Sequence, residues 1–187
     1  MTAVGQLIRL AAIVAGFFSV AAIAEAQPVR LFEQAIVAQD HNYDCGPAAL
    51  VTLIAARSGQ HVGLEHVKKQ ITLSTEEARR VQEDGYSLLQ LGAMAKAVSA
   101  EPIIREISEP DLTQLSLPVL VYLSLPTGPH FSLVTAMAGR YIALADPSRG
   151  RVIWSREAFL AAWAPRGKGV VLSLTAALVV SAINHVR

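Results

Sequence analysis

The sequence predicts an α+β fold, with helices in the first half of the chain and antiparallel strands in the second half. Between residues 45 and 99, apolar side chains recur at helical spacing. From residue 119 to residue 174, short runs of β-branched and aromatic residues alternate with Gly and Pro turns. The chain has 187 residues, of which 52% are hydrophobic, so it can fill one sizeable core and is not a disordered tail.

The best-defined helix is predicted to begin at Cys45 and to stop at Gly59. Pro47 is tolerated in a first helical turn, and Gly is a common residue just after a helix ends. The residues between leave no wide polar face, so we expect this helix to be buried all round. Shorter helices are predicted to follow, over residues 64–71, 74–83 and 87–99, the second of them opened by a capping box.

The second half is predicted to hold five strands, at residues 119–125, 130–138, 141–146, 151–154 and 169–174, with a helix at 155–163. The second and third strands form a hairpin that turns near Gly139. A three-residue loop would place His130 directly opposite Asp146, with their Cβ atoms about 5 Å apart on one face. A two-residue loop would shift that pairing by one residue.

The two ends of the chain are apolar. Residues 7–24 are almost continuously apolar, and Ala24 and Ala26 fit the small-residue rule for signal-peptidase cleavage. We therefore interpret residues 1–26 as a secretory signal peptide, which predicts a periplasmic or extracellular protein. The alternative is that residues 7–24 remain as a membrane anchor, because about 18 apolar residues nearly span a bilayer.

The signal peptide leaves residues 27–175 as a single predicted domain and residues 176–187 as an apolar C-terminal tail. The tail either docks on the domain or contacts a membrane surface or a partner.

Charge and motif content exclude several classes of function. The formal net charge is +1 and the basic residues are scattered, so no nucleic-acid-binding surface is predicted. No phosphate-binding GxxxxGK[ST] loop is present, so no nucleotide is expected. His61 and His66 are five residues apart, which puts them off one helical face, and we expect neither a metal nor a cofactor.

Cys45 is the one cysteine of the chain. Exported proteins usually pair their cysteines, so a single one is a candidate reactive thiol, with a buried inert cysteine as the alternative. At the first turn of a helix, the amide dipoles favour a thiolate and a free backbone N–H can face an oxyanion. Gly46 would let a substrate backbone approach closely, and Asp44 is expected to cap the helix rather than to take part in catalysis.

A cysteine nucleophile also needs a nearby imidazole, a group that orients it and oxyanion donors. The hairpin geometry suits His130 and Asp146 for the first two roles, although both residues also fit as simple strand ends at turns. Gln39, six residues before Cys45, has a side-chain amide that could serve the oxyanion, but its spacing alone does not single it out.

Three ordered motifs resemble those of cysteine peptidase family 39, the bacteriocin-processing peptidases of double-glycine leaders. The motifs are QDHNYDCGPAAL at residues 39–50, PHFSLV at 129–134 and ADP at 145–147, with a similar central segment, GYSL, at 85–88. The resemblance covers about residues 33–174. It implies a papain-like fold in which the buried nucleophile helix packs on an antiparallel sheet.

The resemblance also implies the roles of the site residues. Cys45 would be the nucleophile, His130 the general base and acid, Asp146 the residue that orients His130, and Gln39 an oxyanion donor. The implied activity is a cysteine endopeptidase that cleaves peptide or leader sequences of exported proteins after small residues such as Gly-Gly, without a metal or a cofactor.

The best-known members of that family are domains of ABC exporters, whereas this sequence resembles the stand-alone branch that carries a signal peptide. Some of that branch is similar to accessory peptidases of fimbrial or amyloid secretion systems, which suggests such a system as a partner. Two other functions stay open at this point. One is a non-catalytic module that binds a secreted peptide, and the other is an acyltransferase or amidase with the same thiol chemistry.

Overall fold

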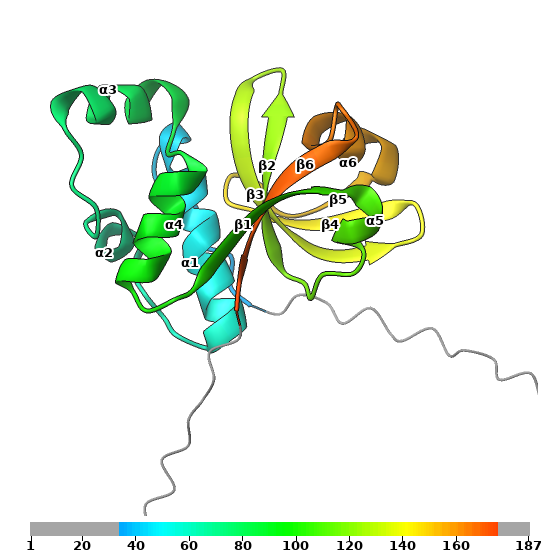
Figure 1. Cartoon of the computed structure of the whole chain (residues 1–187), viewed down its shortest axis with the longest axis horizontal. Coiled ribbons are helices and arrows are strands. Elements are labelled where there is room, and N and C mark those ends of the chain that lie inside the picture. The colour runs from blue at the N-terminus through cyan, green and yellow to red at the C-terminus, as the bar shows by residue number, and fades with distance from the viewer. Residues whose placement is uncertain (1–33, 176–187) are drawn as a thin grey trace, which may run out of the picture.

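The computed structural model describes residues 34–175 (Figure 1). The predicted signal peptide at residues 1–26 and the apolar tail at residues 176–187 lie outside the described residues. Within residues 34–175, no helix is both long enough and apolar enough to cross a bilayer.

The helical half follows the apolar pattern of the sequence. Its elements are the short 3-10 helix η1 (Asn42–Asp44) and the helices α1 (Cys45–Ser58), α2 (Leu64–Lys68), α3 (Thr75–Asp84) and α4 (Leu88–Ala97). The long helix ends where predicted, because Gly59 takes a left-handed φ of +71° that other residues rarely adopt. Capping boxes at Ser74 and Ser87 start α3 and α4. All four predicted helices are confirmed, although α2 ends three residues early.

The second half forms a six-stranded sheet in which every neighbouring pair is antiparallel, in the order β1-β6-β2-β3-β4-β5. The strands are β1 (Pro102–Ser108), β2 (Val119–Leu125), β3 (Gly128–Ala138), β4 (Tyr141–Asp146), β5 (Gly150–Ser155) and β6 (Lys168–Leu174), with the helices α5 (Glu109–Leu112) and α6 (Arg156–Trp163). The five predicted strands and α6 are confirmed, and so is the α+β class.

The sequence analysis missed β1 and α5. β1 is an edge strand that pairs only with β6, and most of its side chains are exposed. It therefore lacks the alternation of apolar and polar residues by which a half-buried strand is recognised. α5 is a single turn of four residues, too short to show a helical period.

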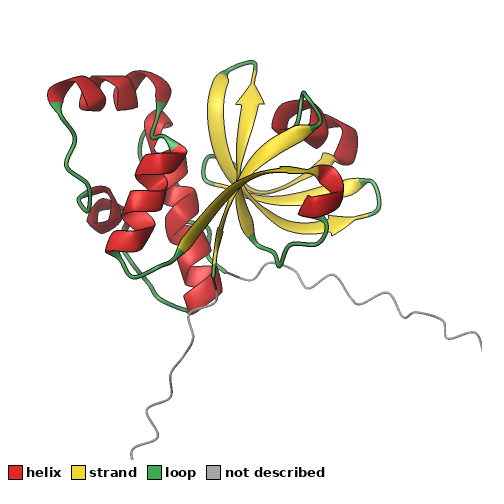
Figure 2. Cartoon of the chain, viewed as in Figure 1, coloured by secondary structure: helices red, strands yellow, loops and turns green. Residues whose placement is uncertain are grey.

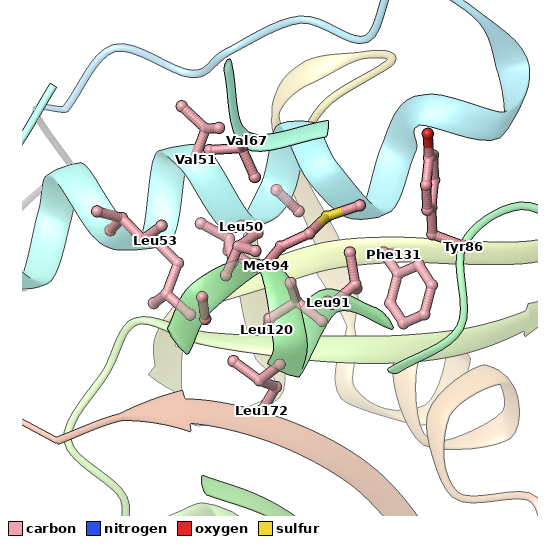
Figure 3. Close-up of a cluster of buried hydrophobic side chains, with 14 of the residues drawn as sticks. Leu50, Val51, Leu53, Val67, Tyr86, Leu91, Met94, Leu120, Phe131 and Leu172 are labelled. Carbon is pink, nitrogen blue, oxygen red and sulfur yellow. The ribbon is translucent and has the colours of Figure 1, made fainter. Parts of the chain in front are cut away.

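The central part of the sheet is covered on both faces, which explains why consecutive residues of β2, from Val119 to Val121, are all buried (Figure 2). Helices α1 to α4 gather on one side of the molecule, and α6 packs across β2 on the other. Along β2, Leu120 joins the core under α1 while Val121 joins the core under α6. Figure 3 shows Leu50 of α1 pointing toward the sheet residues Leu120 and Leu172. The buried helix is thereby fixed against the sheet.

Candidate active site

Cys45 is the first residue of α1 and the free cysteine of the described chain. Its side chain is 4% exposed, and it lines a cleft between η1, the end of α3 and the hairpin that joins β2 to β3. The lining residues are Asn42, Tyr43, Cys45, Gln82, Glu83, Asp84, Gly85, Thr127, Gly128, Pro129 and Phe131. The Cys45 thiol is therefore almost fully buried but lines the cleft.

Gly46 packs against the core of the protein. Gly46 is buried, and a Cβ built on it would lie 3.1 Å from side-chain carbons of Leu91 and Phe131. Contacts that short are tighter than most real Cβ contacts, so with a side chain at position 46 Leu91 and Phe131 would have to shift by a few tenths of an ångström. Figure 3 shows Leu91 and Phe131 close together beneath the start of α1. The small residue lets α1 lie close to the sheet, and the approach of a substrate backbone to Gly46 stays a prediction.

His130 and Asp146 are in direct contact. Nε2 of His130 lies 2.8 Å from Oδ2 of Asp146, and the two side chains are 14% and 2% exposed. Cys45 lies close enough to His130 to contribute, with Asp146, to the raised pKa of the ring. The structure thus brings a thiol, an imidazole and a carboxylate together in that order.

The register that produces this contact differs from the predicted one. The β3–β4 hairpin turns through two residues, because Ala138 pairs with Tyr141, and direct pairing of His130 with Asp146 is wrong. A bulge at Thr135 then adds one residue to β3. Without the bulge, His130 and Asp146 would point to opposite faces. With it, they lie on one face as diagonal neighbours.

The second oxygen of Asp146 is held by the turn that follows β4. Oδ1 accepts hydrogen bonds from the backbone N–H of Ser148 at 2.9 Å, the Ser148 hydroxyl at 2.7 Å and the backbone N–H of Arg149 at 3.1 Å. Sequence reasoning missed Ser148. An Asp followed two residues later by a Ser is the pattern of an Asx turn, and this signal could have found it.

These contacts set the charges of the pair. Burial of the ring alone would lower the pKa of His130, but hydrogen bonds and charges from Asp146 and Cys45 outweigh it and raise that pKa from 6.5 to about 9. Burial alone would raise the pKa of Asp146, but the hydrogen bonds from His130 and Ser148 lower it from 3.8 to about 2. At neutral pH the pair is therefore an imidazolium and a carboxylate.

Gln39 lies beside the Asp146 turn. Its backbone N–H donates to the carbonyl of Pro147 at 3.1 Å, which ties the segment before η1 to the residue after Asp146. The side-chain Nε2 donates to the carbonyl of His41 at 3.1 Å, and one amide proton remains for another acceptor. Oε1 is buried and has no hydrogen-bond partner among the described residues.

Asp44 does not cap α1, contrary to the expectation from the sequence. Its side chain makes no capping hydrogen bond, although the residue stands at the N-cap position. Instead the fully buried carboxylate turns to Lys68 of α2, with Oδ2 3.0 Å from Nζ, and to the ring of His41, 3.1 Å from Nδ1. Asp44 therefore forms an ion pair with Lys68 of α2 instead of the expected capping hydrogen bond to α1.

No metal site is evident in the part of the chain that the structure describes. Among residues 34–175, no three His, Cys, Asp or Glu side chains gather closely enough to hold a metal ion.

Comparison with known sequences gives one family. The model of the peptidase C39 family matches residues 33–177. An uncharacterized protein of Methanothermobacter marburgensis is 30% identical over 131 residues, which cover 69% of this chain and 82% of that protein. A second uncharacterized protein, from Methanothermobacter thermautotrophicus, is 27% identical over the same shares.

Comparison with solved structures gives the same kind of fold. A double glycine motif protease from an AMS/PCAT transporter, in complex with the leader peptide, has a TM-score of 0.60 at 22% identity, covering 76% of this chain and 91% of that chain. The peptidase domain of Streptococcus ComA, a bifunctional ABC transporter of a quorum-sensing pathway, has a TM-score of 0.58 at 20% identity, covering 74% and 96%. These likenesses confirm the papain-like α+β fold that the motifs implied.

Proposed function

Because the chain belongs to the peptidase C39 family, a family of cysteine peptidases, we propose that it is a cysteine endopeptidase with Cys45 as its nucleophile. One observation carries the proposal. The thiol at the start of α1 lies close to the imidazole of His130, and a buried carboxylate, Asp146, holds that ring. This is the arrangement that nucleophilic thiol catalysis needs, reached here from two distant parts of the chain.

The first half of the proposed reaction forms an acyl-enzyme. The Cys45 thiolate attacks the scissile carbonyl, and the developing oxyanion is stabilised by the backbone N–H of Cys45 and the side-chain amide of Gln39. The C–N bond then breaks, and the His130 imidazolium gives its proton to the leaving amine. Asp146 keeps the ring oriented and stabilises its protonated form during the attack.

The second half restores the thiol. Water loses a proton to the neutral ring of His130 and attacks the thioester, and the C–S bond breaks to release the carboxylic acid. The proton returns to the Cys45–His130 pair. No step needs a metal or a redox cofactor.

The substrate proposed is a peptide or leader sequence of an exported protein, cleaved after small residues such as Gly-Gly. The cleft at Cys45 adjoins a second, more apolar hollow, and the two share Asp84, Gly85, Pro129 and Phe131. The second hollow is completed by Tyr86, Ser87, Leu88, Tyr122 and Val170. A channel that leads from the thiol to apolar side chains supports binding of an extended peptide with apolar residues on one side of the cut. The protease from the AMS/PCAT transporter, which has the same fold, was solved with a leader peptide bound.

The proposed place of action is outside the cytoplasm, in the periplasm or the extracellular space, after removal of residues 1–26. This rests on the apolar run at residues 7–24 and the small residues after it. We further propose a secretion system, of fimbrial or amyloid type, as the partner that supplies the substrate, with the tail at residues 176–187 as a membrane-surface contact.

The test is cleavage of matched peptides by the purified full chain. One peptide carries Gly-Gly after a run of apolar residues, and its partner carries Val-Val at the same position. Mass spectrometry of the products is expected to show cleavage after Gly-Gly by the wild type, none by Cys45→Ala and little of the Val-Val peptide.

Other outcomes would change the proposal in distinct ways. Cleavage by Cys45→Ala would contradict a thiol peptidase. A wild-type protein that binds the peptide and never cuts it would be a binding module instead. A product that forms only when an amine acceptor is added would indicate acyl transfer.

A further inference from the structure

The carboxylate directly before the nucleophile has no task in the proposed reaction. Asp44 is 0% exposed, makes no capping hydrogen bond to α1, and leaves Oδ1 without a hydrogen-bond partner among the described residues. A buried anion one residue from Cys45 opposes formation of a thiolate, because like charges disfavour each other in a medium of low dielectric constant. The site therefore needs something that cancels this charge.

Lys68 meets that need. Its Nζ lies 3.0 Å from Oδ2 of Asp44 and 2.6 Å from Oε1 of Glu65, and its side chain is only 14% exposed. Glu65 is 60% exposed, so its own charge is largely screened by water. Of the two carboxylates that the Lys68 ammonium contacts, Asp44 is the one that is shielded from water.

The position of Lys68 is fixed by the packing of α2. The preceding residue, Val67, is fully buried, and Figure 3 shows it beside Val51 of α1. The ammonium is thus held at the first turn of the nucleophile helix by apolar packing one residue away. A freely moving surface lysine would not be held in this way.

Other ionisable groups surround this pair. On the helix side, His41 contacts Asp44 through Nδ1 but is 58% exposed, and Tyr43 and Tyr86 lie within electrostatic reach. On the sheet side, His130 and Asp146 face Cys45. Of the two basic side chains that contact Asp44, Lys68 is the one shielded from solvent.

We propose that Lys68 is a positioning residue for the nucleophile, whose ammonium neutralises Asp44 and fastens α2 to the turn that begins α1. The proposal deepens the proposed function and rests on it, since it concerns the readiness of Cys45 to attack. A purely structural ion pair makes a different prediction, because it would support folding without changing the pH at which the thiol ionises.

The test follows the rate of iodoacetamide alkylation of Cys45 in the full chain from pH 5 to pH 9, by intact mass. Lys68→Met leaves the Asp44 charge bare, so the acidic limb of the rate profile is expected to move up by about 0.5 to 1 pH unit. Asp44→Asn removes the anion, and the limb is expected to move down by a similar amount. The double variant is expected to lie near the wild type, and Lys68→Arg to stay with it.

Lys69→Met is the matched control, because it removes the same charge from the next residue, which is exposed. Lys69→Met is expected to leave the acidic limb of the alkylation rate profile at the pH of the wild type. Circular dichroism checks that each variant is folded. If Lys68→Met is not, the double variant is compared with Asp44→Asn, and a limb at higher pH in the double variant supports the role of Lys68, whereas an equal limb would overturn it.

Shifts of opposite sign support the proposal, whereas an unmoved limb, or shifts in the same direction, would overturn it. Alkylation needs no peptide substrate, so the result stands even if the protein cuts none of the peptides offered.

Discussion

Two buried carboxylates belong to the surroundings of Cys45, Asp146 at the end of β4 and Asp44 directly before α1, and the protein holds them in different ways. Asp146, on the sheet side, uses Oδ2 for His130 and satisfies Oδ1 with three donors from its own turn. Asp44, on the helix side, uses Oδ2 for Lys68 and His41, while Oδ1 has no hydrogen-bond partner within residues 34–175.

The difference indicates two roles: Asp146 orients the His130 ring, whereas the charge of Asp44 is neutralised by Lys68. Three hydrogen bonds from one short turn fix the plane of the Asp146 carboxylate, so the His130 ring that it contacts is fixed as well. The Asp44 carboxylate is fixed by fewer hydrogen bonds but lies against a shielded cation. Removal of Asp146 should therefore damage the chemistry, whereas removal of Asp44 should mainly shift its pH dependence.

Asp146→Asn is expected to produce the largest effect. The amide keeps the shape but loses the charge that stabilises the imidazolium, so kcat should fall by a factor on the order of 10³. The rate of the wild type is expected to decline as pH rises through about 9, where His130 loses its proton. Because the neutral amide of the variant would no longer raise the pKa of His130, that alkaline limb should move toward lower pH.

The measurement is kcat against pH for both proteins on one peptide. Asp44→Asn serves as the matched control and should keep kcat within about tenfold. Equal losses of kcat in the two variants would contradict the claim that Asp146 and Asp44 have different roles.

Ser148→Ala is expected to produce a smaller effect on the same side of the site. It removes one of the three donors to Oδ1 and leaves both backbone N–H groups in place. The loss of one hydrogen bond corresponds to about 1 kcal/mol, so kcat/KM should fall less than tenfold. Ser124→Ala, at an exposed position on β2, is the control and should leave kcat/KM unchanged. A loss as large as that of Asp146→Asn would mean that the turn, rather than the carboxylate, orients the ring.

The sequence could predict the helix behind Cys45 because its apolar run is long and ends at a glycine. It could also bring His130 and Asp146 near each other, since a hairpin between them follows from the turn at Gly139. It could not give their register, because nothing in the residues around Thr135 marks a bulge.

Contacts between elements that are distant in the sequence could not be predicted from local sequence patterns. The pairing of Asp44 with Lys68 joins residues 24 apart through the packing of α2 on α1, which spacing alone does not reveal. Gln39 was singled out by family resemblance and not by its own chemistry, and its backbone contact with Pro147 depends on the fold.

The central claim is that His130 activates the thiol of Cys45. The rate of iodoacetamide alkylation at pH 6, compared between the wild type and His130→Ala by intact mass, tests it most directly. We predict that Cys45 reacts at least about tenfold faster in the wild type, because the imidazolium stabilises the thiolate. An equal or slower rate in the wild type would contradict the account and leave Cys45 as a buried, inert cysteine.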